Sequence, residues 1–144
     1  MKKCDEVMTK DPVCLLPDDM AAKAAELMKS ENVGSLPVIE NNQTKKLIGI
    51  VTDRDLVLKI VAEGLDAKST KVEVAMTHKV VTRLAGDDLQ EALNSMAEHQ
   101  LRRIPVVDKN DKVVGIISQS DVATRSDKRK KTAKMIREIS KASV

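Results

Sequence analysis

Residues 36–55 of this chain read LPVIENNQTKKLIGIVTDRD, and residues 104–121 read IPVVDKNDKVVGIISQSD. Both stretches contain a Pro-Val step, a polar turn, a Gly-Ile step, and a Thr or Ser placed three residues before an Asp. The second stretch is two residues shorter, and the difference falls in the polar turn. So ordered a correspondence indicates an internal repeat rather than chance.

The repeat extends toward the N-terminal side of each stretch. Met8-Thr9 returns 68 residues later as Met76-Thr77, and the same shift pairs Ala24 with Ala92. Neither copy is long enough to bury a good core alone, so we expect the copies to pack face to face, with a ligand at their pseudo-twofold seam. The expected organisation is a first repeat at 7–65, a linker at 66–74, a second repeat at 75–127, and a basic C-terminal helix or tail at 128–144.

Composition sets limits on the class of protein. The 144 residues are 42% hydrophobic and include no Phe, Trp or Tyr, so the core is aliphatic and a bound base cannot stack on an aromatic ring. The apolar runs are strand-sized, far below the roughly 20 residues of a membrane span, and no apolar signal segment follows the N-terminus. We therefore expect a cytoplasmic protein that does not enter the membrane, with Cys4 and Cys14 as free thiols. His78 and His99 are too remote from each other and from the cysteines to predict a metal site.

Charge is divided unevenly along the chain. Between residues 122 and 144 there are eight Lys or Arg against two acidic residues, a net +6, which leaves −3 for the remainder of the +3 total. The basic run at 128–131 has two interpretations. It is the solvated face of a terminal helix, or it is a surface for nucleic acid or anionic lipid. We favour the first, because no aromatic residues or glycines alternate with the charges.

Each repeat is predicted to run strand, helix, strand, strand, helix. The expected strands lie at 13–16, 36–39 and 47–51 in the first copy, and at 80–84, 104–107 and 113–117 in the second. We expect the acidic pairs Asp18-Asp19 and Asp87-Asp88 to be N-caps of the first helix in each copy. The closing helices should begin at Thr52 and Ser118, the first of them ending near Gly64. Repeated, mixed elements of this size predict an α+β sandwich.

The motif that carries chemistry is GIVTDRD at residues 49–55, echoed as GIISQSD at 115–121. One interpretation is structural, because a hydroxyl followed by a carboxylate three residues later forms a capping box at a helix start. The other is functional: a phosphate would bind at the helix N-terminus, and Asp55 or Asp121 would accept hydrogen bonds from both hydroxyls of a ribose. The motif alone leaves both interpretations open.

The doubled pattern of Met-Thr, Pro-Val strand and Gly-Ile-Val-Thr-x-x-Asp resembles a tandem pair of cystathionine-β-synthase (CBS) domains, over roughly residues 7–127. The resemblance implies two pseudo-twofold-related β-α-β-β-α repeats packed as a CBS-domain pair. It implies clefts that bind adenosine-containing ligands: AMP, ADP, ATP, S-adenosylmethionine or an NAD-type dinucleotide. It further implies regulation rather than catalysis, a homodimer, and signalling through self-association or an effector protein that the sequence does not identify.

The family's binding positions can be carried over residue by residue. The first site would comprise Thr52, Asp55, Thr77, Val80, Val81, Arg102, Arg103 and Ile104. The second site would comprise Ser118, Asp121, Thr9, Pro12, Val13, Gly34, Ser35 and Leu36. Arginines bind phosphate through forked, charge-assisted hydrogen bonds, and the second site has Gly34-Ser35 in place of the arginine pair. We therefore expect the Asp55 site to prefer phosphorylated adenosines and the Asp121 site to be weaker, vacant or suited to less anionic ligands.

No motif typical of an enzyme is present. The sequence contains no Gly-x-x-x-x-Gly-Lys loop, no His-Glu-x-x-His pair and no Gly-x-Ser-x-Gly elbow, so we predict a protein that is not an enzyme and requires no cofactor. Two functions stay open. The leading one is a sensor of adenosine ligands. The alternative is a ligand-independent protein-interaction module, whose basic C-terminal tail would bind nucleic acid or a partner.

Overall fold

The computed structural model describes residues 2–125 and 136–139 of the chain. Helices and strands alternate in an α+β fold, as predicted. The chain divides into two compact units: unit 1 is Met1–Pro12 with Val81–Val144, and unit 2 is Val13–Val80. Each unit therefore has its own core and can be described by itself.

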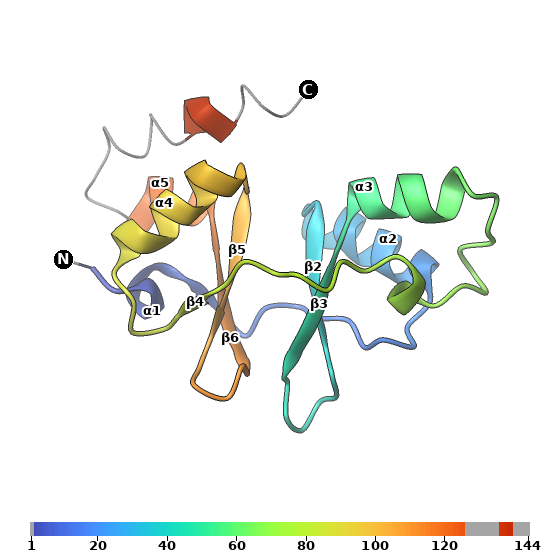
Figure 1. Ribbon diagram of the computed structural model, residues 1–144, viewed down its shortest axis with the longest axis horizontal. Coiled ribbons are helices and arrows are strands. Elements are labelled where there is room, and N and C mark those ends of the chain that lie inside the picture. Colours follow the sequence, from blue (N-terminus) through green and yellow to red (C-terminus); the bar gives the residue numbers. More distant parts are fainter. Residues whose placement is uncertain (1, 126–135, 140–144) are drawn as a thin grey trace. The chain divides into compact units, whose positions relative to one another are not determined.

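Unit 2 is built around one β-hairpin (Figure 1). Strand β2 (Ser35–Ile39) pairs antiparallel with β3 (Leu47–Thr52), and helix α2 (Ala21–Glu31) packs against β2. The remaining elements are α3 (Asp53–Leu56), the π-helix η1 (Val57–Val61) and the 3-10 helix η2 (Val72–Val74). The hairpin and α2 enclose an aliphatic core that includes Leu15, Ala24, Met28, Leu36, Val38, Val51 and Val72.

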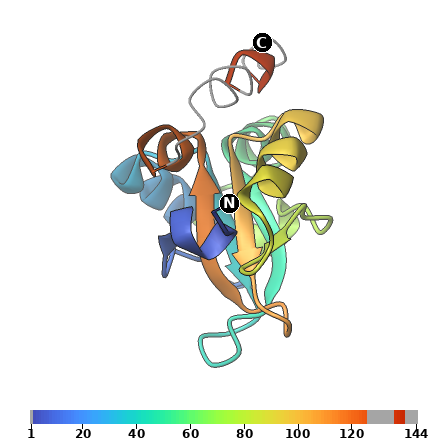
Figure 2. The same cartoon turned by 90° about the vertical axis from the view of Figure 1, so that its left-hand side faces the viewer.

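Unit 1 contains a four-stranded sheet in the order β1-β6-β5-β4. Its elements are α1 (Cys4–Val7), β1 (Thr9–Lys10), β4 (Arg83–Leu84), α4 (Leu89–His99), β5 (Arg103–Val107), β6 (Val113–Ser118) and α5 (Gln119–Arg125). Figure 2 shows α1 in front of β6, and α1 contacts α4, α5 and β6. The core again consists of aliphatic and sulfur-containing side chains, as the composition requires.

A short Met-Thr segment joins the hairpin of each unit, and it comes from the other repeat. In unit 1, Thr9 pairs antiparallel with Ile116 of β6, while in unit 2 Thr77 pairs with Ile50 of β3. Each compact unit contains residues of both repeats, so the units do not test where one repeat ends and the next begins. The repeat boundaries stay a prediction.

This pairing explains the glycine in each Gly-Ile step. A Cβ atom at Gly49 would lie 2.9 Å from Met76 Sδ and 3.0 Å from the Thr77 carbonyl oxygen, and Gly115 meets Met8 and Thr9 in the same way. Only glycine lets the Met-Thr backbone approach the strand this closely. The Met-Thr and Gly-Ile motifs therefore repeat together because they contact each other.

The expected helix caps are wrong for Asp18-Asp19, while in the second pair Asp88 does occupy the N-cap position. Helix α2 has Met20 at its N-cap, and Asp88, at the N-cap of α4, makes no capping hydrogen bond with its side chain. Instead, Asp19 Oδ2 accepts the Leu16 N–H at 2.8 Å, and Asp87 Oδ2 accepts the Leu84 N–H at 2.9 Å. The carboxylates close the turn before each helix, a competing local use of Asp that the same sequence pattern permits.

The strand predictions hold for the hairpins and fail partly outside them. Residues 13–16 form only a parallel bridge, from Leu15 to Val38, and the expected strand at 80–84 shortens to Arg83–Leu84. Both segments lie at the edge of a hairpin and have few ladder partners to extend them. Helix α1 was not predicted, because four residues are too short to show helical periodicity.

The closing helices begin where predicted. Thr52 caps α3, and α5 starts directly after Ser118. In the first copy the helical turns end before Gly64, whose φ of 70° lies in the left-handed region. The expected linker at 66–74 packs on unit 2, since the Ala22 N–H donates to the Ala67 carbonyl at 2.9 Å.

Most of the predicted C-terminal helix or tail lies outside the described residues. The described part, 136–139, is helical, with Ile139 fully buried and Ile136 partly buried against the core of unit 1. Residues 128–131, the basic run, are outside the described part. Within the described residues, no helix is both long and apolar enough to cross a bilayer.

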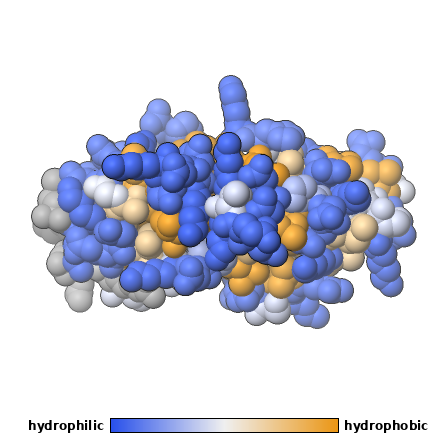
Figure 3. Space-filling model, turned by 90° about the horizontal axis from the view of Figure 1, so that it is seen from below, coloured by the Kyte–Doolittle hydropathy of each residue, from blue (hydrophilic) through white to orange (hydrophobic). Residues whose placement is uncertain are grey.

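Polar side chains dominate the face of the molecule in Figure 3, with apolar residues showing between them. Several large apolar side chains are exposed on η1 and just after it: Val57 by 55%, Leu58 by 45%, Val61 by 69% and Leu65 by 43%. We call Val57, Leu58 and Val61 the η1 patch. Exposed apolar groups that gather on one turn are more informative than single ones.

Candidate functional site

In unit 2 the Thr-x-x-Asp motif forms a closed pair of hydrogen bonds where β3 ends and α3 begins. The Asp55 N–H donates to Thr52 Oγ1 at 3.0 Å, and the Thr52 N–H donates to Asp55 Oδ2 at 3.0 Å. This is a capping box, so the structural interpretation of the motif is confirmed. It also fixes the Asp55 side chain, which is only 13% exposed.

Two further groups converge on the Asp55 carboxylate. Thr77, delivered by its pairing with Ile50, places Oγ1 at 3.4 Å from both Oδ1 and Oδ2. Lys59 places Nζ at 3.1 Å from Oδ1, one helical turn after Asp55. The carboxylate is thus held by its own helix start, by a hydroxyl from the Met-Thr segment and by an ammonium group.

Unit 1 repeats the arrangement with Ser118 and Asp121. The Asp121 N–H donates to Ser118 Oγ and the Ser118 N–H donates to Asp121 Oδ2, both at 3.1 Å. Thr9 Oγ1 donates to Asp121 Oδ1 at 3.0 Å. Asp121 is 8% exposed. The sequence prediction that Thr77 accompanies Asp55 and that Thr9 accompanies Asp121 therefore agrees with the contacts of each unit.

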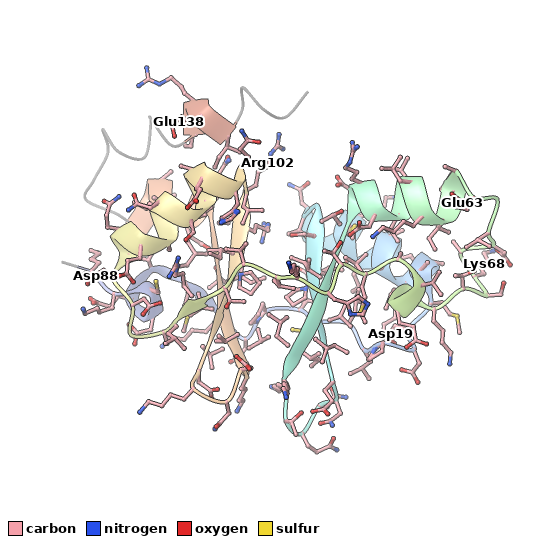
Figure 4. The ribbon with its side chains drawn as sticks, viewed as in Figure 1. Asp19, Glu63, Lys68, Asp88, Arg102 and Glu138 are labelled. Carbon is pink, nitrogen blue, oxygen red and sulfur yellow. The ribbon has the colours of Figure 1, made fainter. Side chains whose placement is uncertain are left out.

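Within unit 1 the arginine pair lies beside the Ser118-Asp121 motif, and its expected grouping with Asp55, a residue of unit 2, stays a prediction. Arg103 lies opposite Ser118 in the β5–β6 hairpin, and the Arg102 carbonyl accepts the Gln119 N–H at 3.1 Å. Burial lowers the pKa of the half-buried Arg103 guanidinium, and the negative charge of Asp121 opposes that shift. Figure 4 shows Arg102 beside the start of β5. The charges of Arg103 and Asp121 are therefore close enough to interact.

The corresponding positions in unit 2 are Gly34 and Ser35. Ser35 lies opposite Thr52 in the β2–β3 hairpin, and the Asp53 N–H donates to the Gly34 carbonyl at 2.9 Å. The physical reason is the same in both units. An antiparallel hairpin brings the residue that begins its first strand next to the residue that ends its second. Each unit therefore brings the start of its own first hairpin strand beside its own Thr/Ser-x-x-Asp motif, and the expected charge difference between the two sites stays a prediction.

The remaining predicted residues divide into two groups. Leu36 and Ile104 are buried in the cores of their own units. Pro12-Val13 and Val80-Val81 are the two places where the chain passes from one unit to the other. Val13 is exposed by 38%, and Pro12, Val80 and Val81 are half-buried. Whether these residues contact a ligand stays a prediction.

Sequence reasoning missed Lys59. Its signal was available, because a Lys four residues after an Asp on a helix is placed for an ion pair. Among residues 2–125 and 136–139, no group of three or more His, Cys, Asp or Glu side chains is arranged to hold a metal ion. What the arrangement offers chemically is two immobilised carboxylates, Asp55 half-buried and Asp121 buried, each beside a hydroxyl and near a cation, suited to accepting hydrogen bonds from vicinal hydroxyls.

Comparison with known proteins agrees with this geometry. The family model of the CBS domain matches residues 4–62 and 71–128. The chain belongs to the CBS-domain family and is a tandem pair of such domains.

Relatives of similar length are found in Bacillus subtilis (strain 168). The chain is 39% identical to the protein YlbB, over 97% of this chain and 93% of YlbB. It is 37% identical to the CBS domain-containing protein YhcV, over 85% of this chain and 84% of YhcV. Among solved structures, CBSX2 in complex with AMP superposes with a TM-score of 0.72 at 27% identity, covering 86% of this chain and 95% of that one.

Proposed function

We propose that this protein is a regulatory module that binds an adenosine-containing ligand and signals by a change of conformation or assembly. The observation that carries the proposal is the doubled site, in which Asp55 and Asp121 are each immobilised by a capping box and flanked by a threonine of the other repeat. A fixed carboxylate can accept hydrogen bonds from both hydroxyls of a ribose without further ordering cost. The AMP complex of CBSX2 supports this class of ligand.

The charges at the two sites suggest different ligands. Arg103 lies within electrostatic reach of Asp121, and a guanidinium binds phosphate through two parallel hydrogen bonds. We therefore propose that the Asp121 site takes the phosphorylated ligand, with AMP, ADP or ATP as candidates. The Asp55 site, where Lys59 is already paired with the carboxylate, suits adenosine or S-adenosylmethionine.

The output of the module would pass through another chain. The η1 patch exposes three large aliphatic side chains directly after the Asp55 motif. A second copy of the protein that covers this patch would remove apolar surface from water, which favours a homodimer with an isologous interface. An effector protein would then read the state of the dimer. Cys4 and Cys14, which form no disulfide in the described part of the chain, fit a reducing, cytoplasmic environment.

Calorimetry and thermal melting with adenosine, AMP, ADP, ATP and S-adenosylmethionine test the proposal. A ligand at about 100 times its dissociation constant adds roughly 2.7 kcal/mol to the free energy of unfolding, a shift of several degrees. D55N and D121N should each remove one binding event. D18N serves as the control, because Asp18 is exposed and belongs to neither proposed site. If none of these ligands shifts the melting temperature, or if the D55N/D121N protein binds as well as the wild type, a ligand-independent interaction module replaces this function.

A further inference from the structure

Lys59 lies on an unusual helical turn. The residues that follow α3 form the π-helix η1, in which the Ala62 N–H donates to the Val57 carbonyl at 2.8 Å, five residues back. Such single π turns insert one residue into a helix and change the direction of the side chains that follow. The turn begins two residues after Asp55, so it affects which side chain next faces the Asp55 carboxylate.

The ammonium group of Lys59 connects two parts of the site. Its Nζ is 3.1 Å from Asp55 Oδ1 and 3.1 Å from the Ala75 carbonyl oxygen. Ala75 lies two residues before Thr77, whose Oγ1 contacts the same carboxylate. Lys59 therefore links the helical side of the site to the Met-Thr segment on its other side.

The two carboxylate oxygens retain capacity for a ligand. Oδ2 accepts the Thr52 N–H at 3.0 Å, and Oδ1 faces Lys59 at 3.1 Å. A carboxylate offers about four lone-pair directions, two on each oxygen. The Thr52 N–H and Lys59 each take one, and the other contact is the long one of 3.4 Å from Thr77 Oγ1 to both oxygens, which the two hydroxyls of a ligand would replace. With both oxygens already oriented, the remaining directions are set before any ligand binds.

We propose that Lys59 is a positioning residue of the Asp55 site, holding the carboxylate and the 75–77 segment in the orientation that recognises a ribose diol. The proposal deepens the function proposed above and rests on it for the identity of the ligand. This positioning role differs from phosphate binding, because Lys59 would act on the ligand through Asp55 and Thr77 and would not contact a phosphate itself. In unit 1 the cation beside the carboxylate is Arg103, from a strand, so the two sites can be altered separately.

The chain provides a matched control. Lys23 forms an ion pair with Asp19, also four residues apart, at 3.2 Å on α2. The set of variants is therefore K59M, K59R as the conservative replacement, and K23M, which removes an equivalent pair away from the site.

The first readout needs no ligand. The Thr77 N–H donates to the Ile50 carbonyl at 2.8 Å, and the Ile50 N–H donates to the Thr77 carbonyl at 2.9 Å. If Lys59 holds the 75–77 segment, K59M should accelerate hydrogen exchange of these two amides about fivefold, while K59R and K23M leave it unchanged. Unchanged exchange in K59M overturns the proposal, whatever the protein binds.

The second readout measures diol recognition at one site. In a D121N background, calorimetry compares adenosine with 2′-deoxyadenosine at the Asp55 site. With Lys59 present, we expect the D121N protein to bind adenosine about tenfold more tightly than 2′-deoxyadenosine. K59M should reduce this preference to about twofold, and K59R should retain most of it. A larger loss for AMP than for adenosine in K59M would mean that Lys59 contacts phosphate, which overturns the positioning role. If neither adenosine nor AMP, ADP, ATP or S-adenosylmethionine binds the wild-type protein, the proposed function fails, while the exchange result still decides the role of Lys59.

Discussion

Gly49 offers the sharpest test of why the two motifs repeat together. In G49A the new Cβ would lie 2.9 Å from Met76 Sδ and 3.0 Å from the Thr77 carbonyl oxygen. The flexible Met76 side chain can move aside, but the Thr77 carbonyl is held by the Ile50 N–H at 2.9 Å. Overpacking against backbone typically costs 1–3 kcal/mol, so we expect G49A to lower the free energy of unfolding by about 2 kcal/mol.

A change of this size lowers the melting temperature of a chain of 144 residues by roughly 8 °C. Circular dichroism is the appropriate assay, because the protein has no Trp, Tyr or Phe to report by fluorescence. G86A is the matched control, since among the described residues, apart from its chain neighbours, a Cβ at Gly86 would meet no atom within 4 Å. Adding M76A to G49A should restore part of the loss. The reasoning is refuted if G49A and G86A melt within about 1 °C of each other.

Three further predictions concern the described residues. Ile139 is fully buried in the core of unit 1, so I139A should destabilise the protein by about 2 kcal/mol in urea titrations, and a loss below about 0.5 kcal/mol contradicts that packing. Burial raises the pKa of Cys4 and of Cys14 from 9.0 to about 11. The folded state therefore holds these protons more tightly than the unfolded state, and the free energy of unfolding should fall as pH rises from about 9 to 11, less steeply in C14S. R103M in a D55N background should weaken AMP binding at the Asp121 site about tenfold more than adenosine binding, measured by calorimetry; an equal loss for both ligands argues against phosphate binding by Arg103.

Local patterns were sufficient to predict the hairpins and the starts of the closing helices. The Pro-Val and Gly-Ile strands pair across a short turn, and Thr52 bonds with Asp55 three residues away, so neighbours along the chain decide both features. The acidic turns show the limit of this reasoning. Asp19 accepts a hydrogen bond from the Leu16 N–H, three residues earlier, and does not cap the helix that follows. The local sequence permits either use.

Which side chains lie together at each carboxylate depends on contacts between residues far apart in the sequence. Arg103 lies opposite Ser118 because the hairpin of its own repeat closes there, and its expected grouping with Asp55 stays a prediction. Lys59 was overlooked because its value comes from reaching the Ala75 carbonyl as well as Asp55, and Ala75 is 16 residues away along the chain. The spacing of four residues predicts the contact of Lys59 with Asp55, but it gives no information on the contact with the Ala75 carbonyl.

Residue order was thus enough to derive the duplication, the aliphatic core, the hairpins and the two Thr/Ser-x-x-Asp motifs, because these features arise from periodicity and near neighbours. The pairings of Thr9 with Asp121 and of Thr77 with Asp55, each across the boundary between repeats, were expected from the family resemblance alone, and the tertiary structure shows the contacts that make them. The reason is that 112 residues separate Thr9 from Asp121. Contacts at that separation form only when the Met-Thr segment pairs with the edge of a hairpin strand at its glycine. Local sequence preferences do not specify that pairing.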